Sequence, residues 1–238
     1  MAIPLIIGHR GAKGIAPENT LEAFEIGLNF ADGVECDVRL TKDKKIVVIH
    51  DGDIKRTSNG KGRVSQMTLE EIKKFDFGKG QKIPLLSEVF ALVKSKNKKI
   101  IIDIKGDLPS EAKDILFEVG NFLKGNDKEG ISSISSIWQE ALFESKKNGV
   151  QSKTFLVLDV ELMRDDVFKK LKETQADGIS IVYTFINDKL ISALHAQNYL
   201  INVWPVDEPD DILKMSFLGV DKIITDYPET ALKYLKKE

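Results

Sequence analysis

Short apolar runs alternate along this chain with stretches in which apolar residues recur every three or four positions. The first pattern is typical of strands buried on both faces, and the second predicts amphipathic helices. The predicted strands are residues 4–7, 34–38, 46–49, 99–104, 131–137, 153–157, 178–182, 200–203 and 222–224. The predicted helices are residues 20–30, 86–94, 110–123, 139–147, 161–174, 188–197, 209–217 and 228–236.

Strands that alternate with helices predict a parallel sheet, because a helix supplies the crossover that parallel neighbours require. So many strand–helix units in a chain of 238 residues favour a closed TIM-type (β/α)8 barrel over an open sheet. We therefore expect the α/β class, with a single barrel domain over residues 1–238.

The nine predicted strands exceed the eight places of such a barrel by one, and the surplus lies within residues 34–49. Residues 41–45 are too few for a helical crossover. A tight turn there would pair the two runs as a hairpin, with His50 opposite Cys36 and Asp37. Two parallel strands are the alternative, and the pattern leaves both open. Either arrangement brings His50 close to the acids of the first run.

Residues 52–83 interrupt the strand–helix rhythm. The segment is polar, rich in Gly, Lys, Ser and Thr, and contains one short helical pattern at 68–75. We interpret it as a small lobe inserted after the third strand, lying over the mouth of the barrel without a core of its own.

Composition narrows the possible partners. The 35 basic and 37 acidic residues give a net charge of −2, which predicts binding to neither nucleic acid nor an anionic membrane. The sequence shows neither a signal-peptide pattern nor an apolar run near the ~20 residues of a membrane span. The one cysteine, Cys36, excludes an internal disulfide and fits a reducing compartment. We expect a cytoplasmic protein without stable membrane insertion; no pattern specifies its oligomeric state.

Glu35 and Asp37 lie two residues apart within an apolar run. On a strand they share one face, and two acids on a buried face are costly unless they bind something. The simplest occupant is a hard divalent cation, for which both are candidate oxygen ligands. His50, directly after the next run, is a candidate proton carrier at neutral pH. The alternative is an exposed strand whose acids face solvent.

Three more groups of polar side chains follow predicted strands. His9 and Arg10 come directly after the first strand, where a barrel carries its active site, although a structural role is the simpler interpretation. Asp103 and Lys105 share one face of a later strand, as a third metal ligand and a phosphate partner or as a structural ion pair. Trp204 ends another strand, where it either borders a substrate or packs in the core.

Three other polar residues have structural explanations. Asn19 followed by Glu22 predicts an N-cap and a capping box at the first helix. His195 lies within a predicted helix, where surface exposure or packing explains it.

Several motifs occur together in one order and spacing. They are Gly8-His9-Arg10-Gly11, Pro17-Glu18-Asn19-Thr20, Glu35-x-Asp37-Val38, Leu40-Thr41-Lys42-Asp43, Val48-Ile49-His50-Asp51, Ile102-Asp103-Ile104-Lys105, Asn202-Val203-Trp204 and Ile223-Ile224-Thr225-Asp226-Tyr227-Pro228. This set closely resembles the glycerophosphodiester phosphodiesterases, and the resemblance spans essentially the whole chain.

The resemblance implies a TIM-type barrel that hydrolyses glycerophosphodiesters, small-molecule substrates, to an alcohol and sn-glycerol 3-phosphate with one divalent cation, Mg or Ca, with Mn as a possibility. The implied roles are metal binding by Glu35, Asp37 and Asp103, acid–base catalysis by His9 and His50, phosphate binding by Arg10 and Lys105, and glycerol contact by Trp204. Two departures stand out: Asp103 replaces the usual Glu, and Asp207 replaces a usual Asn.

Two other functions remain open. One is a lysophospholipase D-like or cyclising phosphodiesterase reaction of the same superfamily. The other is a catalytically silent barrel that binds phosphodiesters, which the presence of both histidines and all three carboxylates disfavours.

Overall fold

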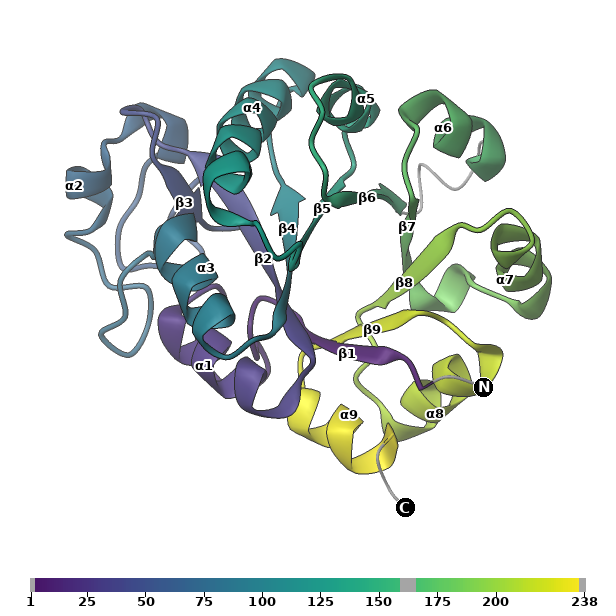
Figure 1. Ribbon diagram of the computed structural model, residues 1–238. Coiled ribbons are helices and arrows are strands. Elements are labelled where there is room, and N and C mark those ends of the chain that lie inside the picture. Colours follow the sequence, from purple (N-terminus) through teal and green to yellow (C-terminus); the bar gives the residue numbers. More distant parts are fainter. Residues whose placement is uncertain (1–2, 159–165, 236–238) are drawn as a thin grey trace.

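The computed structural model describes residues 3–158 and 166–235, and its strands form a ring surrounded by helices (Figure 1). The strands are β1 (Leu5–Gly8), β2 (Gly33–Leu40), β3 (Ile46–Val48), β4 (Lys99–Ile104), β5 (Ser132–Ser136), β6 (Lys153–Leu158), β7 (Gly178–Val182), β8 (Leu200–Trp204) and β9 (Lys222–Thr225). The α-helices are α1 (Leu21–Phe30), α2 (Leu69–Ile72), α3 (Leu86–Ser95), α4 (Pro109–Asn126), α5 (Gln139–Lys147), α6 (Val167–Thr174), α7 (Asp188–His195), α8 (Pro209–Leu218) and α9 (Pro228–Leu235).

Eight of these strands close the barrel that the alternating pattern predicted. They run in the order β1-β9-β8-β7-β6-β5-β4-β2, and β1 also pairs with β2. Every pairing within this ring is parallel. The carboxyl ends of all eight strands therefore meet at one mouth of the barrel, where barrel enzymes carry their active sites.

The ninth strand resolves the alternative left open by the sequence. β3 pairs with β2 in antiparallel register, with Val38 opposite Val48. The Thr41 N–H donates to the Lys45 carbonyl at 3.0 Å and closes the turn, and Lys44 has a left-handed backbone with φ of 57°. The two runs therefore form a hairpin, and β3 lies outside the ring.

Strand β4 shows how the apolar runs are divided between two environments. Ile100 and Ile102 belong to the main core between the strands and the helices. Ile101 points into the barrel, where it clusters with Ile7 and Ile224. Burial on both faces explains why the strands read as continuous apolar runs.

The segment 52–83 differs from our expectation that it lacks a core of its own. It carries the short α2 and a 3-10 turn at Val64–Gln66. Together with the end of the hairpin and the residues just beyond, it buries a separate apolar cluster of Val47, Ile49, Ile54, Val64, Ile72, Phe77 and Ile83. Val47 of β3 and Ile49, just after β3, complete this cluster, so the segment itself supplies few of its apolar residues.

Two helix predictions need comment. Asn19 is not the N-cap of α1; the cap is Thr20, whose hydroxyl accepts the Ala23 N–H at 3.2 Å. Asn19 instead has a left-handed backbone, with φ of 59°. The predicted helix 161–174 is observed from Val167, and its residues 161–165, like residue 236 of the last predicted helix, lie outside the described ranges.

Within residues 3–158 and 166–235, none of the helices combines the length and the apolar character needed to cross a membrane.

We expect Gly178→Ala to destabilise the barrel by about 1–3 kcal/mol, a typical cost of overpacking. A Cβ atom at Gly178 would lie 2.1 Å from the backbone oxygen of Leu200, so two paired strands would have to separate. Gly125→Ala is the matched control, because that glycine lies in α4 with open space around it. Urea denaturation measures both; equal stabilities would contradict the argument.

Candidate active site

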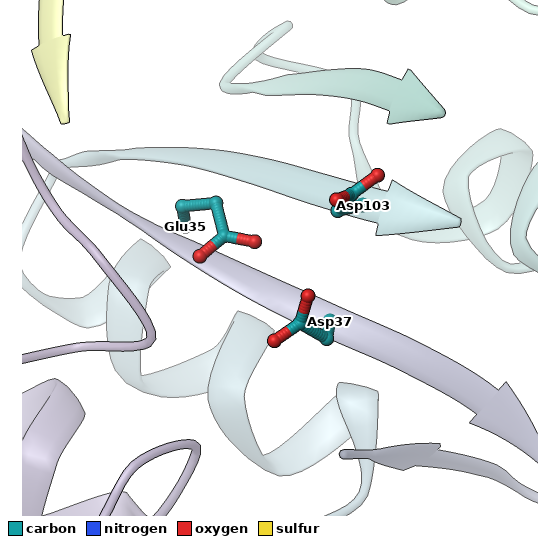
Figure 2. A group of neighbouring side chains, drawn as sticks. All are labelled: Glu35, Asp37 and Asp103. Carbon is teal, nitrogen blue, oxygen red and sulfur yellow. The ribbon is translucent and has the colours of Figure 1, made fainter. Parts of the chain in front are cut away.

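Three carboxylates converge at the carboxyl-terminal mouth of the barrel. Glu35 and Asp37 lie two apart on β2, and Asp37 is the register partner of Asp103 on β4. One oxygen from each of the three lies within 4.8 Å of the other two. Figure 2 shows the three carboxylates gathered over the neighbouring strands. All three residues are buried, which excludes the alternative of an exposed acidic strand face.

Two cationic side chains compensate part of this buried negative charge. The Lys105 Nζ lies 2.7 Å from Asp103 and 3.1 Å from Asp37. The Arg10 Nε lies 3.1 Å from Asp37, and the Arg10 backbone N–H donates to Glu35 at 3.0 Å. Asp103 and Lys105 thus form the ion pair that was one alternative, yet Asp103 also belongs to the carboxylate group.

The surroundings separate the proton affinities of the acids. Burial raises the pKa of Glu35 well above its usual range, and the negative charges of Asp37 and Asp103 raise it further. Burial also tends to raise the pKa of Asp37, but Lys105 and Arg10 outweigh it and hold that pKa far below normal.

The donor set fits a hard divalent cation. Convergent carboxylate oxygens are the ligands that Mg²⁺ and Ca²⁺ prefer. A cation at this point would replace the proton that Glu35 otherwise binds. The shorter Asp103, in place of the Glu implied by the resemblance, still brings its oxygen into the group.

The side chain of His9 is held by a carboxylate from the far end of the chain. Its Nδ1 lies 2.6 Å from Asp226 Oδ1, because β1 and β9 are neighbours in the ring. A carboxylate only accepts hydrogen bonds, so in the neutral form of the ring the proton is on Nδ1 and the lone pair is on Nε2. The Nε2 atom lies 4.0 Å from Glu35 Oε2, at the edge of the acidic group.

His50 has the same arrangement, with the carboxylate of the next residue in the chain. Its Nδ1 lies 2.7 Å from Asp51 Oδ1. Burial lowers the pKa of His50, against the opposing effect of Asp37. The ring is therefore largely neutral near pH 7, the state in which a histidine can accept a proton.

A chain of ion pairs connects the two histidine regions. Arg56, from the segment 52–83, donates to Asp51 at 2.6 Å and to Glu18 at 2.7 Å. Glu18 also accepts from Arg10 at 2.7 Å. Asp51, whose pKa is lowered to about 2 chiefly by Arg56, is therefore ionised and held in place beside His50.

Trp204 packs in the core, which was one of its two interpretations, and its contact with a substrate stays a prediction. It is the last residue of β8, at the carboxyl-terminal mouth, and it packs against Ile7, Ile101 and Ile224 inside the barrel. Its Nε1 is buried without a hydrogen-bond partner among the described residues, and so are both amide atoms of Asn202. His195 lies elsewhere, half-exposed and 3.1 Å from Asp221.

Sequence reasoning named three further residues in its motifs but assigned them no role in this site. Asn19 donates from Nδ2 to Asp37 at 2.8 Å, which replaces the capping role we predicted. Asp226 holds His9 from 217 residues away, so no local pattern could have paired them. Asp207 accepts the Asp226 N–H at 2.8 Å and thereby fixes the loop that carries Asp226.

A TIM-type barrel whose strand ends combine clustered carboxylates, carboxylate-held histidines and cations has the framework of an enzyme for anionic substrates. Residues 9–230 match the glycerophosphoryl diester phosphodiesterase family. The chain belongs to this family and is an enzyme of the phosphoric diester hydrolase class.

Three similar proteins illustrate the match. A glycerophosphodiester phosphodiesterase of Caldanaerobacter subterraneus subsp. tengcongensis is 35% identical, with 98% of each chain covered. The crystal structure of one from Thermotoga maritima is 28% identical with a TM-score of 0.84, covering 98% of this chain and 99% of that one. A phosphodiesterase of Oleispira antarctica, solved in complex with the product sn-glycerol-3-phosphate, shares the fold at 23% identity and a TM-score of 0.88, covering 99% and 98%.

We expect Ca²⁺ binding to release protons and to weaken as the pH falls. The raised pKa of Glu35 means that a cation must displace a proton, and lower pH keeps that proton bound. Isothermal titration calorimetry in two buffers of different ionisation enthalpy measures the released protons.

Two asparagine variants test whether the three carboxylates bind one shared ion. Asp103→Asn should weaken Ca²⁺ binding by about 10-fold or more. Asp114→Asn, at an exposed position of α4, should bind as the unmodified protein does. Equal affinities in the two variants would contradict a shared site.

Proposed function

We propose that this chain hydrolyses glycerophosphodiesters to an alcohol and sn-glycerol 3-phosphate, with one divalent cation and acid–base catalysis by two histidines. The observation that carries the proposal is the convergence of His9, Arg10 and Lys105 on the buried carboxylates, in a member of this family. The complex of the Oleispira antarctica phosphodiesterase with sn-glycerol-3-phosphate supports a small phosphate-containing substrate.

Glu35, Asp37 and Asp103 would hold the cation, which we take to be Mg or Ca, with Mn as an alternative. When bound, such an ion neutralises charge on the phosphodiester and acidifies a glycerol hydroxyl. The buried, convergent oxygens support this assignment, and the pKa of Glu35, raised by burial and by the charges of Asp37 and Asp103, is consistent with a site that a cation would stabilise.

The two histidines supply proton transfer. In the proposed mechanism the glycerol 2-hydroxyl attacks phosphorus, one histidine takes its proton, and the other protonates the departing alcohol oxygen. Water then opens the cyclic phosphate with the proton transfers reversed. Asp226 and Asp51 act as positioning residues, because each fixes the tautomer of one ring through Nδ1.

Arg10 and Lys105 would bind the nonbridging phosphate oxygens, where negative charge grows in the transition state. Both already lie against the carboxylates, so their positive charges are fixed before a substrate arrives. Trp204 would line the glycerol side of the site. Its Nε1 has no hydrogen-bond partner among the described residues and would donate to a glycerol oxygen.

We further propose a cytoplasmic location. The support is Cys36, which is a free thiol buried in the main core, as expected in a reducing compartment.

His9→Ala and His50→Ala should each lower kcat by about 10²–10⁴, the usual contribution of general acid–base catalysis. The measurement is release of sn-glycerol 3-phosphate from glycerophosphocholine with Mg²⁺, Ca²⁺ or Mn²⁺. His195→Ala is the control and should keep full activity, since His195 pairs with Asp221 away from the site. Full activity in either of the first two variants would overturn the mechanism.

Phosphorus NMR of the products separates hydrolysis from its alternatives. We expect sn-glycerol 3-phosphate to be the final product, because the site has a second histidine to activate water. Accumulation of a cyclic phosphate alone would identify a cyclising phosphodiesterase. Binding of the diester without turnover under all three cations would identify a silent barrel.

A further inference from the structure

A cavity of about 750 Å³ opens at the amino-terminal mouth of the barrel, opposite the candidate active site. Its lining includes Lys99, Lys153 and Lys222. These are the first residues of β4, β6 and β9, which lie at separated positions around the ring (Figure 1). Parallel strands begin at one rim, so three amino groups border the same opening.

The positive charge of this opening is only partly balanced by the protein. Among the described residues, no carboxylate forms an ion pair with Lys99, Lys153 or Lys222. The Lys222 Nζ instead lies 4.3 Å from the centre of the Phe155 ring, which is fully buried.

The two acidic residues that line the cavity also accept backbone N–H groups, and the negative charge of Asp221 partly opposes the lowering of the pKa of Lys222. Asp221 accepts the Ile201 N–H at 2.8 Å and lies 3.1 Å from the His195 ring. Asp127 accepts the N–H groups of Ile131 and Ser132 at 2.9 and 3.0 Å. Lys124 and Lys128 also line the cavity, so its lining contains five lysines and two aspartates.

Repulsion among the lysines contributes, after burial, to a lowered pKa of Lys222. Burial lowers the pKa of Lys222 to about 8, and the positive charges of Lys153 and Lys99 contribute to that shift. A bound anion would relieve the repulsion, whereas an empty opening leaves it uncompensated.

We propose that the amino-terminal mouth binds the dianion of a phosphate monoester. Three ammonium groups surrounding one opening suit a tetrahedral group with two charges better than a single carboxylate. The apolar part of the lining, which includes Leu123, Ile131 and Val150, offers room for the ester's organic part. A cavity of this size lies in the range that small ligands occupy.

This site is separate from the catalytic mouth. Ile7 and Ile101 line the cavity and also belong to the apolar cluster inside the barrel. That cluster lies between the lysines and the carboxylates. The proposal therefore stands independently of the hydrolysis proposed above.

Protection of Lys222 from acylation tests the site directly. A limiting amount of an N-hydroxysuccinimide acetate at pH 8 labels the amine, and peptide mass spectrometry quantifies it. Inorganic phosphate at about 10 mM should lower Lys222 labelling at least fivefold relative to chloride of equal ionic strength, because a bound dianion covers the amine and raises its pKa. Labelling of the exposed Lys61 should not change.

Two variants show whether the effect is local. Lys99→Gln/Lys153→Gln should abolish the protection, and both positions are exposed enough to leave the fold intact. Lys55→Gln/Lys61→Gln, equal in charge but located in the segment 52–83, should retain it. Circular dichroism and the Tm of each variant check folding.

The protection of Lys222 by three phosphate compounds identifies the kind of ligand. Equal protection by inorganic phosphate, phenyl phosphate and sn-glycerol 3-phosphate assigns the site to the phosphate group alone. Stronger protection by phenyl phosphate assigns an apolar ester, and stronger protection by sn-glycerol 3-phosphate assigns the proposed reaction product. Equal labelling in all three probes and in chloride overturns the proposal, as does protection that persists in Lys99→Gln/Lys153→Gln.

Discussion

Burial of three carboxylates on two adjacent strands is the constraint on which the catalytic end of this barrel depends. Carboxylates removed from water are strongly destabilising unless positive charges and hydrogen bonds surround them. Arg10 and Lys105 meet that demand in part, and Asn19 adds a hydrogen bond to Asp37. The loops after β1 and β4 are thereby drawn to the same point.

Carboxylates also orient the two histidine rings. Each ring binds a carboxylate through Nδ1, so that its tautomer is set by hydrogen bonding and its other nitrogen remains free for proton transfer. Arg56 then joins Asp51 to Glu18, and through it to Arg10. Residues from the loop after β1, from the end of the hairpin and from the segment 52–83 thus form one hydrogen-bonded network.

The two mouths of the barrel carry excess charge of opposite sign. The carboxyl-terminal mouth has more acid than its cations balance, and the amino-terminal mouth has five lysines but two aspartates in its lining. The apolar cluster of Ile7, Ile101 and Ile224 lies between them. In a closed barrel these side chains fill the interior, so each mouth can develop its own chemistry.

The chain's local patterns determined most of the fold. Apolar periodicity identified all nine strands, and the spacing of Glu35 and Asp37 placed both on one face, since alternation along a strand is a local property. Only the tertiary structure decided the hairpin, the pairing of His9 with Asp226, the role of Asn19 and the gathering of lysines at one rim. The hairpin had a local signal in its short turn, but that signal left two arrangements open. The other features arise from strand register and ring closure, which bring together residues far apart in the chain and leave no local sequence signal.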